Sequence, residues 1–114
     1  MDNVNKRRIA LDLPISFHCW LERRAKKNER YKLGEIKMLC ANLIADDSFF
    51  NTEHWREQRL CYINRVAEEK NTKWVTLDLP LSFHSWLKSV SKENGQSKRD
   101  ELKLIFLWMQ DTLN

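Results

Sequence analysis

The sequence repeats itself at an offset of 66 residues, and this repeat limits the possible folds more than any other feature. Residues 11–21, LDLPISFHCWL, match residues 77–87, LDLPLSFHSWL, at nine of eleven positions. Identity continues without a gap at five later positions of the first copy, which are Lys26, Asn28, Lys32, Glu35 and Lys37. We interpret the chain as two copies, residues 6–48 and 72–114, joined by a connector at 49–71.

Each copy is too short to be expected to fold alone. A unit of about 43 residues buries too little apolar surface to stabilise itself. Two related copies in one chain are therefore expected to share one core. This predicts a single domain that spans residues 1–114.

Both copies begin with alternating apolar and more polar residues. The apolar positions are Ile9, Leu11 and Leu13 in the first copy and Val75, Leu77 and Leu79 in the second. This period of two is typical of a strand with one buried face. A proline follows each strand, at Pro14 and Pro80, and proline suits the first turn of a helix.

Two stretches with helical spacing follow in each copy. Asn28 and the pair Asn94-Gly95 are stop signals between them, and Ser97 is a candidate N-cap for the last helix. The first stripe is Phe17, Trp20, Leu21 and Ala25, or Phe83, Trp86, Leu87 and Val90. The second stripe is Ile36, Leu39, Cys40 and Leu43, or Leu102, Ile105, Phe106 and Met109.

The order strand–helix–helix, present twice, predicts the overall architecture. A lone strand needs a partner for its backbone groups, and the available partner is the strand of the other copy. The expected fold is mainly α, with a two-stranded antiparallel ribbon over four helices. The connector at 49–71 also has helical spacing, with Asn51 or Thr52 as its cap, so an extra linker helix is expected.

This layout resembles the ribbon-helix-helix family of the Arc/MetJ type. The residues that carry the resemblance are Leu77-Asp78-Leu79-Pro80 and Asn94-Gly95-Gln96-Ser97, with Asp100-Glu101-Leu102 behind them. The first copy keeps the Leu-Pro and helix pattern but lacks the glycine turn. Family members are usually homodimers, so this chain looks like a fused, single-chain pseudo-dimer.

The resemblance implies sequence-specific binding of double-stranded DNA, with the ribbon in the major groove. The base-contacting residues would be those on the outward ribbon face, Arg8, Ala10, Asp12, Trp74, Thr76 and Asp78. If Ala10 lies opposite Thr76, Arg8 lies opposite Asp78, and a cross-strand ion pair is expected there.

The resemblance also implies phosphate contacts at the start of the second helix of each copy. Those backbone contacts would come from Arg30, Lys32, Ser97, Lys98 and Arg99, with Lys6 and Arg7 adding to them from a flexible arm. The expected function is a transcriptional repressor or a plasmid or phage nucleoprotein factor. One molecule would act as a monomeric pseudo-dimer, and two would bind DNA cooperatively.

Other features of the sequence exclude several classes of function. No nucleophile motif, phosphate loop, zinc motif or paired carboxylates are present, so neither an enzyme nor a metal or other cofactor is expected. His18 and His84 repeat, but they lack further ligands at metal-binding spacing. Cys19, Cys40 and Cys61 are expected to be small buried thiols.

The sequence carries no signal for export or for a membrane. No apolar run approaches the ~18–20 residues of a membrane span, and the polar N-terminus leads into no signal-peptide core. A cytoplasmic protein is therefore expected. The formal charge of +4 permits nucleic-acid binding without demanding it.

An alternative is a protein-interaction module or inhibitor that keeps the fold and no longer binds DNA. Two aspartates on the ribbon oppose an approach to phosphates. The connector also offers a face with Trp55 and Tyr62 that would bind a protein partner if it were exposed.

Overall fold

The computed structural model describes residues 6–45, 50 and 52–113. Within them the chain is mainly helical, with one two-stranded antiparallel sheet, as predicted. In chain order the elements are β1 (Lys6–Pro14), α1 (Ile15–Lys27), α2 (Lys32–Ala45), α3 (Glu53–Glu68), β2 (Thr72–Pro80), α4 (Leu81–Glu93) and α5 (Lys98–Thr112).

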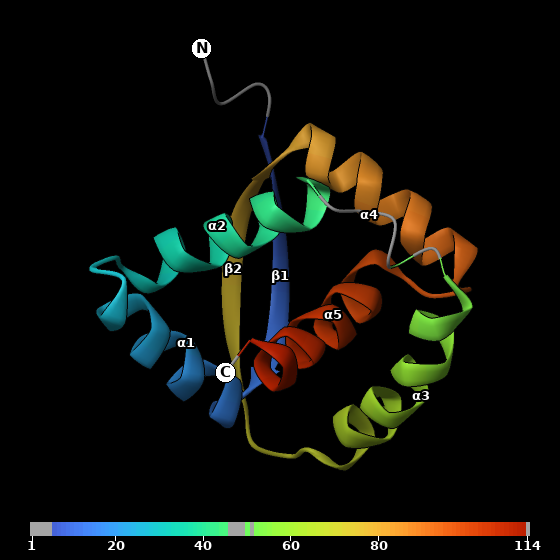
Figure 1. The fold of residues 1–114 in the computed structure, drawn as a ribbon, viewed down its shortest axis with the longest axis horizontal. Helices are drawn as coiled ribbons and strands as arrows, with labels where there is room; N and C mark the ends of the chain where they lie inside the picture. Colours follow the sequence, from blue (N-terminus) through green and yellow to red (C-terminus); the bar gives the residue numbers. More distant parts are fainter. Residues whose placement is uncertain (1–5, 46–49, 51, 114) are drawn as a thin grey trace.

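The two strands pair antiparallel and form a ribbon through the centre of the molecule. Ala10 lies opposite Thr76, and these two residues also correspond in the sequence repeat. Figure 1 shows β1 and β2 side by side, with α2 and α5 crossing the same face of the ribbon. The expected pairing of one strand from each copy is therefore confirmed.

Alternation in the strands divides the ribbon into a buried and an outward face. The fully buried positions include Leu11, Leu13 and Leu77, each 0% exposed. Burial of one such side chain is worth about 1.5–3 kcal/mol, so this face fixes the register of the ribbon. A slip by one residue would turn these leucines toward solvent.

The helices bury the stripes that the sequence predicts. Phe17 of α1 and Phe106 of α5 stack with ring centroids 5.4 Å apart, and both are 0% exposed. Phe17, Trp20 and Phe83 are buried, whereas Trp86 is half-buried against the same core. One core therefore joins both copies.

The predicted helix ends are confirmed at corresponding positions of the two copies. Asn28 and Asn94 are the C-caps of α1 and α4. The next residue has a left-handed backbone in both, with φ of 56° at Glu29 and 68° at Gly95. Ser97 caps α5 by accepting a hydrogen bond from the backbone N–H of Asp100 at 3.1 Å.

The connector forms the predicted helix, α3. Its N-cap is Thr52, whose hydroxyl accepts from the backbone N–H of Trp55 at 3.3 Å. The alternative cap Asn51 and the expected boundary at 48/49 lie outside the described residues. Helix α3 packs along α5, as Figure 1 shows.

The prediction of three buried thiols is wrong for two of them. Cys40 is buried, but Cys19 and Cys61 are exposed. Cys19 lies on α1 outside the stripe of Phe17, Trp20 and Leu21, so helical geometry turns it toward solvent. No helix in the described part of the chain is long and apolar enough to cross a bilayer.

Candidate functional site

The outward face of the ribbon brings together the six residues that the sequence predicts there. Trp74 is 60% exposed, and Arg8, Thr76 and Asp78 are also exposed. Ala10 and Asp12 are half-buried. Together these residues form a continuous face turned away from the core, which we call the ribbon face: Arg8, Ala10, Asp12, Trp74, Thr76 and Asp78.

A cross-strand ion pair occupies one end of the ribbon face. Arg8 Nε lies 3.2 Å from Asp78 Oδ1, with 79% and 49% of the two side chains exposed. The register places these residues opposite each other, as the sequence predicted. A pair this exposed adds little stability, because water screens it. It does hold the guanidinium over the ribbon face.

At the other end of the ribbon face, α5 supplies the partners. Lys103 donates to Asp12 Oδ1 at 2.9 Å, and this hydrogen bond lowers the pKa of Asp12 against the opposing effect of burial. The guanidinium of Arg99 lies 5.9 Å from the ring of Trp74, which is a cation–π contact. Asp12 is therefore less accessible than Asp78.

The two repeated histidines clamp the ribbon to the helices. His18 Nε2 lies 2.9 Å from the carbonyl oxygen of Lys73, and His84 Nε2 lies 2.9 Å from that of Arg7. Each histidine of one copy thus contacts the strand of the other copy. Burial lowers the pKa of His18, which favours the neutral ring that this geometry needs.

The lysines predicted at the helix starts complete these clamps. Lys32 Nζ lies 3.2 Å from His18 Nδ1, and Lys98 Nζ lies 3.3 Å from His84 Nδ1. Both lysines are half-buried. They hold positive charge beside the first turns of α2 and α5, where an anion is favoured.

The other predicted backbone-contacting residues have mixed environments. The expectation that Lys6 and Arg7 lie on a flexible arm is wrong: both are exposed, but they belong to β1, where they pair with Pro80 and Leu79 of β2. Ser97 uses its hydroxyl to cap α5. Arg30 Nη1 donates to Glu35 Oε1 at 3.0 Å, so its side chain serves the fold.

Sequence reasoning missed two buried carboxylates at corresponding positions. Glu35 is 1% exposed and Glu101 is 0% exposed. Glu35 accepts hydrogen bonds from Arg24, Asn28 and Arg30. Burial raises the pKa of Glu35, but these hydrogen bonds outweigh it and the net pKa is lowered. The identity of the two glutamates in the repeat was the available signal.

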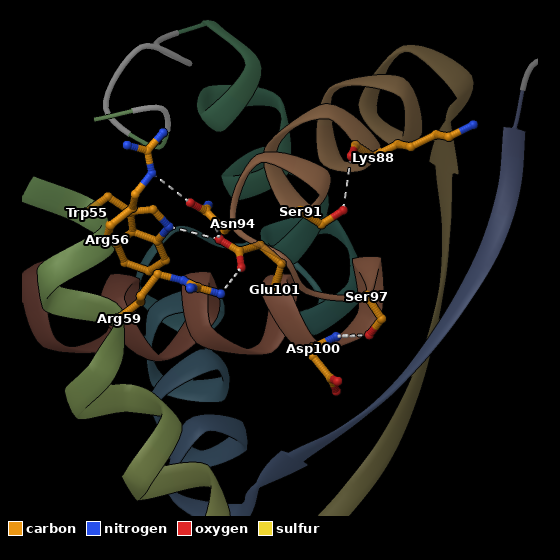
Figure 2. A network of polar contacts seen from close by, with 9 residues as sticks. All are labelled: Trp55, Arg56, Arg59, Lys88, Ser91, Asn94, Ser97, Asp100 and Glu101. Atoms are coloured by element: carbon orange, nitrogen blue, oxygen red, sulfur yellow. Dashed lines mark hydrogen bonds and ion pairs between the residues drawn. The ribbon is translucent and has the colours of Figure 1, made fainter. Parts of the chain in front are cut away.

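Glu101 obtains its partners from the connector. Trp55 Nε1 donates to Oε2 at 2.9 Å, Arg59 to Oε1 at 2.8 Å and Asn94 to Oε2 at 3.0 Å. Figure 2 shows these three side chains converging on the carboxylate of Glu101 from α3 and from the end of α4.

This network corrects the expectation of an exposed partner-binding face on the connector. Trp55 is 0% exposed, because its indole both enters the core and bonds to Glu101. Tyr62 is half-buried and stacks on Trp55 at 6.4 Å. Helix α3 therefore uses this face inside the molecule.

Among the described residues, no three potential metal ligands of the His, Cys, Asp or Glu type gather in one place. The ribbon face and the basic residues beside it are the candidate site, because there the structure brings together the exposed side chains that the sequence predicts. No family model matches the sequence, and comparisons with curated proteins and with solved structures each found no match.

Proposed function

We propose that this chain is a tandem ribbon-helix-helix pseudo-dimer that binds double-stranded DNA in a sequence-specific manner. It would act as a transcriptional repressor or as a plasmid or phage nucleoprotein factor. The observation that carries the proposal is the ribbon face: six side chains exposed or half-exposed on an antiparallel two-stranded ribbon.

The pseudo-dimer part of the proposal is supported by matching contacts in the two copies. Ala10 pairs with Thr76, its own counterpart in the repeat. Each residue of one strand therefore faces the same partner position that its counterpart faces, as around a two-fold axis. The histidine clamps of His18 and His84 are equivalent in both atoms and distances. Two halves that exchange equivalent contacts in this manner are expected of a fused dimer.

The shape and chemistry of the ribbon face suit the major groove. That groove is about 12 Å wide and admits a two-stranded ribbon. Ala10 and Thr76 lie at the centre, where their methyl groups can contact thymine and the Thr76 hydroxyl can bond to a base edge. Arg8 gives one donor to Asp78 and keeps others for guanine or for a backbone phosphate beside it.

Fluorescence anisotropy tests the proposal with a labelled random duplex and with DNA from upstream of the gene, at ~50 and ~200 mM salt. We expect tighter binding to the upstream DNA and a steep loss with salt. Thr76→Glu should abolish the preference. Ser89→Glu, which adds the same charge on the exposed side of α4, should preserve it. Absence of binding to both duplexes at the lower salt contradicts the proposal.

A protein-interaction module of the same fold is the second candidate, and apolar exposure at the start of α2 favours it. Tyr31 is 91% exposed and Leu33 is 48% exposed. These side chains would bury apolar area against a protein surface. This candidate gains if neither duplex binds while Tyr31→Ser weakens association with a purified partner.

A further inference from the structure

The ribbon has two corners that correspond in the repeat but differ in the structure. The first, which we call the closed corner, surrounds Asp12. The other residues that line it are Pro14, Val66, Glu69, Thr72, Lys103 and Leu107. Only about 30 Å³ of space remains there. Val66 and Glu69 come from α3 and from the residue that caps it, so the connector fills this corner.

The second corner surrounds Asp78. Five closed-corner residues belong to the two copies, and each has a counterpart 66 positions away in the other copy. The five are Asp12, Pro14, Thr72, Lys103 and Leu107, and their counterparts, in the same order, are Asp78, Pro80, Lys6, Lys37 and Ala41. All five counterparts line the space at this end of the ribbon. No second connector exists in the described chain to fill it, and Ala41 is smaller than Leu107.

The polar part of this second corner is an open pocket of about 400 Å³ lined by four residues, Lys6, Arg8, Lys37 and Asp78. We call it the open corner. It holds three cations and one carboxylate. In the closed corner Lys103 lies 2.9 Å from Asp12, and their side chains are only 12% and 29% exposed.

The ion pairing of the open corner leaves cations available. Asp78 bonds to Arg8 at 3.2 Å. Among the residues that the structure describes, neither Lys6 nor Lys37 has an ion-pair partner, and both are exposed. Two ammonium groups without an ion-pair partner among the described residues therefore share a pocket with a guanidinium that a carboxylate holds in place.

We propose that the open corner binds a phosphate group and that its source is the DNA backbone beside the ribbon. This inference rests on the proposed DNA-binding function. Lysine ammonium groups and a guanidinium are the side chains that bind phosphate in proteins. Asp78 positions Arg8 there. The closed corner offers no such space, so among the described residues this phosphate pocket has no counterpart at the other end of the ribbon.

The first experiment measures the salt dependence of duplex binding by anisotropy. Lys37→Gln should reduce the slope of log K against log salt concentration by about 0.9, because one phosphate contact is lost. The matched variant at the corresponding position, Lys103→Gln, removes the partner of Asp12 but no phosphate contact, so it should leave the slope unchanged whatever its effect on affinity. Lys92→Gln, an exposed change on α4 away from the ribbon, is the control for net charge. Thermal unfolding verifies that each variant is folded.

A second experiment probes the open corner without DNA. Inorganic phosphate is titrated into ¹⁵N-labelled protein, and the side-chain Nε–H signal of Arg8 is followed. We expect a saturable shift that Lys37→Gln removes and Lys103→Gln preserves. The probe carries no base, so it reports the pocket independently of groove recognition.

The two experiments separate failure of the inference from failure of the proposed function. If the protein binds DNA but Lys37→Gln changes neither the slope nor the Arg8 shift, the phosphate site is refuted and DNA binding stands. If phosphate shifts the Arg8 signal but no duplex binds, the open corner binds free phosphate, and the proposal that the phosphate belongs to DNA is refuted. A slope change without a phosphate shift supports a site that takes only the DNA backbone. Absence of every effect overturns both.

Discussion

Arg59 and Glu101 form a buried ion pair that joins the connector to the second copy. Arg59 Nη2 lies 2.8 Å from Glu101 Oε1, with 9% and 0% of the side chains exposed. In the first copy the corresponding Glu35 is served by Arg24 and Arg30. The second copy has Val90 and Gln96 at those two positions, so α3 supplies the missing cation.

Because Arg59 is the ion-pair partner of the buried Glu101, its removal should greatly lower the free energy of unfolding. Arg59→Met leaves the carboxylate of Glu101 buried without its cation, and should lower the free energy of unfolding by about 3–5 kcal/mol. Urea unfolding measures the change. The double variant Arg59→Met/Glu101→Gln should regain part of the loss, because no buried charge remains.

The first copy provides the matched control. Arg24→Met should cost about 2 kcal/mol or less, because Arg30 still pairs with Glu35. An equal loss for Arg24→Met and Arg59→Met would contradict the view that α3 is the sole source of the cation for Glu101 among the described residues.

The clamp by His18 predicts a pH dependence of stability. The pKa of His18 is lowered by burial from its usual 6.5, so the unfolded chain binds its proton more readily. The free energy of unfolding should therefore rise with pH up to about 6.5 and level off above it. Urea unfolding across this range should show a smaller rise for His18→Gln, which keeps the donor to the Lys73 carbonyl. An undiminished rise in that variant contradicts a lowered pKa.

The left-handed turn after α1 predicts a stabilising substitution. Glu29 has φ of 56°, a conformation that costs an L-residue about 1–2 kcal/mol, although glycine loses more entropy on folding. Glu29→Gly should raise the free energy of unfolding by about 0.5–1 kcal/mol. Gly95→Ala should lower it, since the cost there is backbone strain alone: an added Cβ meets nothing within 4 Å. A change of the same sign in both variants would refute this explanation.

The three cysteines should differ sharply in reactivity. Burial raises the pKa of Cys40 to about 12, and thiolate is the reactive form. Cys19 and Cys61 are exposed. A thiol reagent at neutral pH should label two groups in the native protein and three after unfolding. Native labelling of Cys40, located by mass spectrometry, would show that α2 opens more readily than its burial implies.

The elements were predictable because each depends on a local signal. The alternation at Leu11 and Leu13 identified the strand, and Asn94-Gly95 marked the turn. The repeat predicted the long-range pairing of the two strands, and the ion pair of Arg8 with Asp78 was expected if Ala10 lay opposite Thr76, which is the register of the structure.

Features that depend on the packing of distant segments were not predictable. The helical spacing of Trp55 in the connector does not indicate what this side chain contacts. In the structure it bonds to Glu101, which is 46 positions away in the sequence. Cysteine is a residue type that is usually buried, but Cys19 lies outside the buried stripe of α1. The open corner exists because α3 occurs once while the ribbon has two ends, and no local pattern in Lys6 or Lys37 reveals that.

Mapping of backbone amide shifts on addition of a short duplex tests the central claim most directly, because it locates the DNA on the protein. The account predicts that the perturbed amides cluster on residues 8–12 and 74–78 and at the starts of α2 and α5, with little change on the outer side of α3. Perturbations centred on α3, or none at a protein concentration of ~100 µM and ~50 mM salt, would contradict a DNA-binding ribbon.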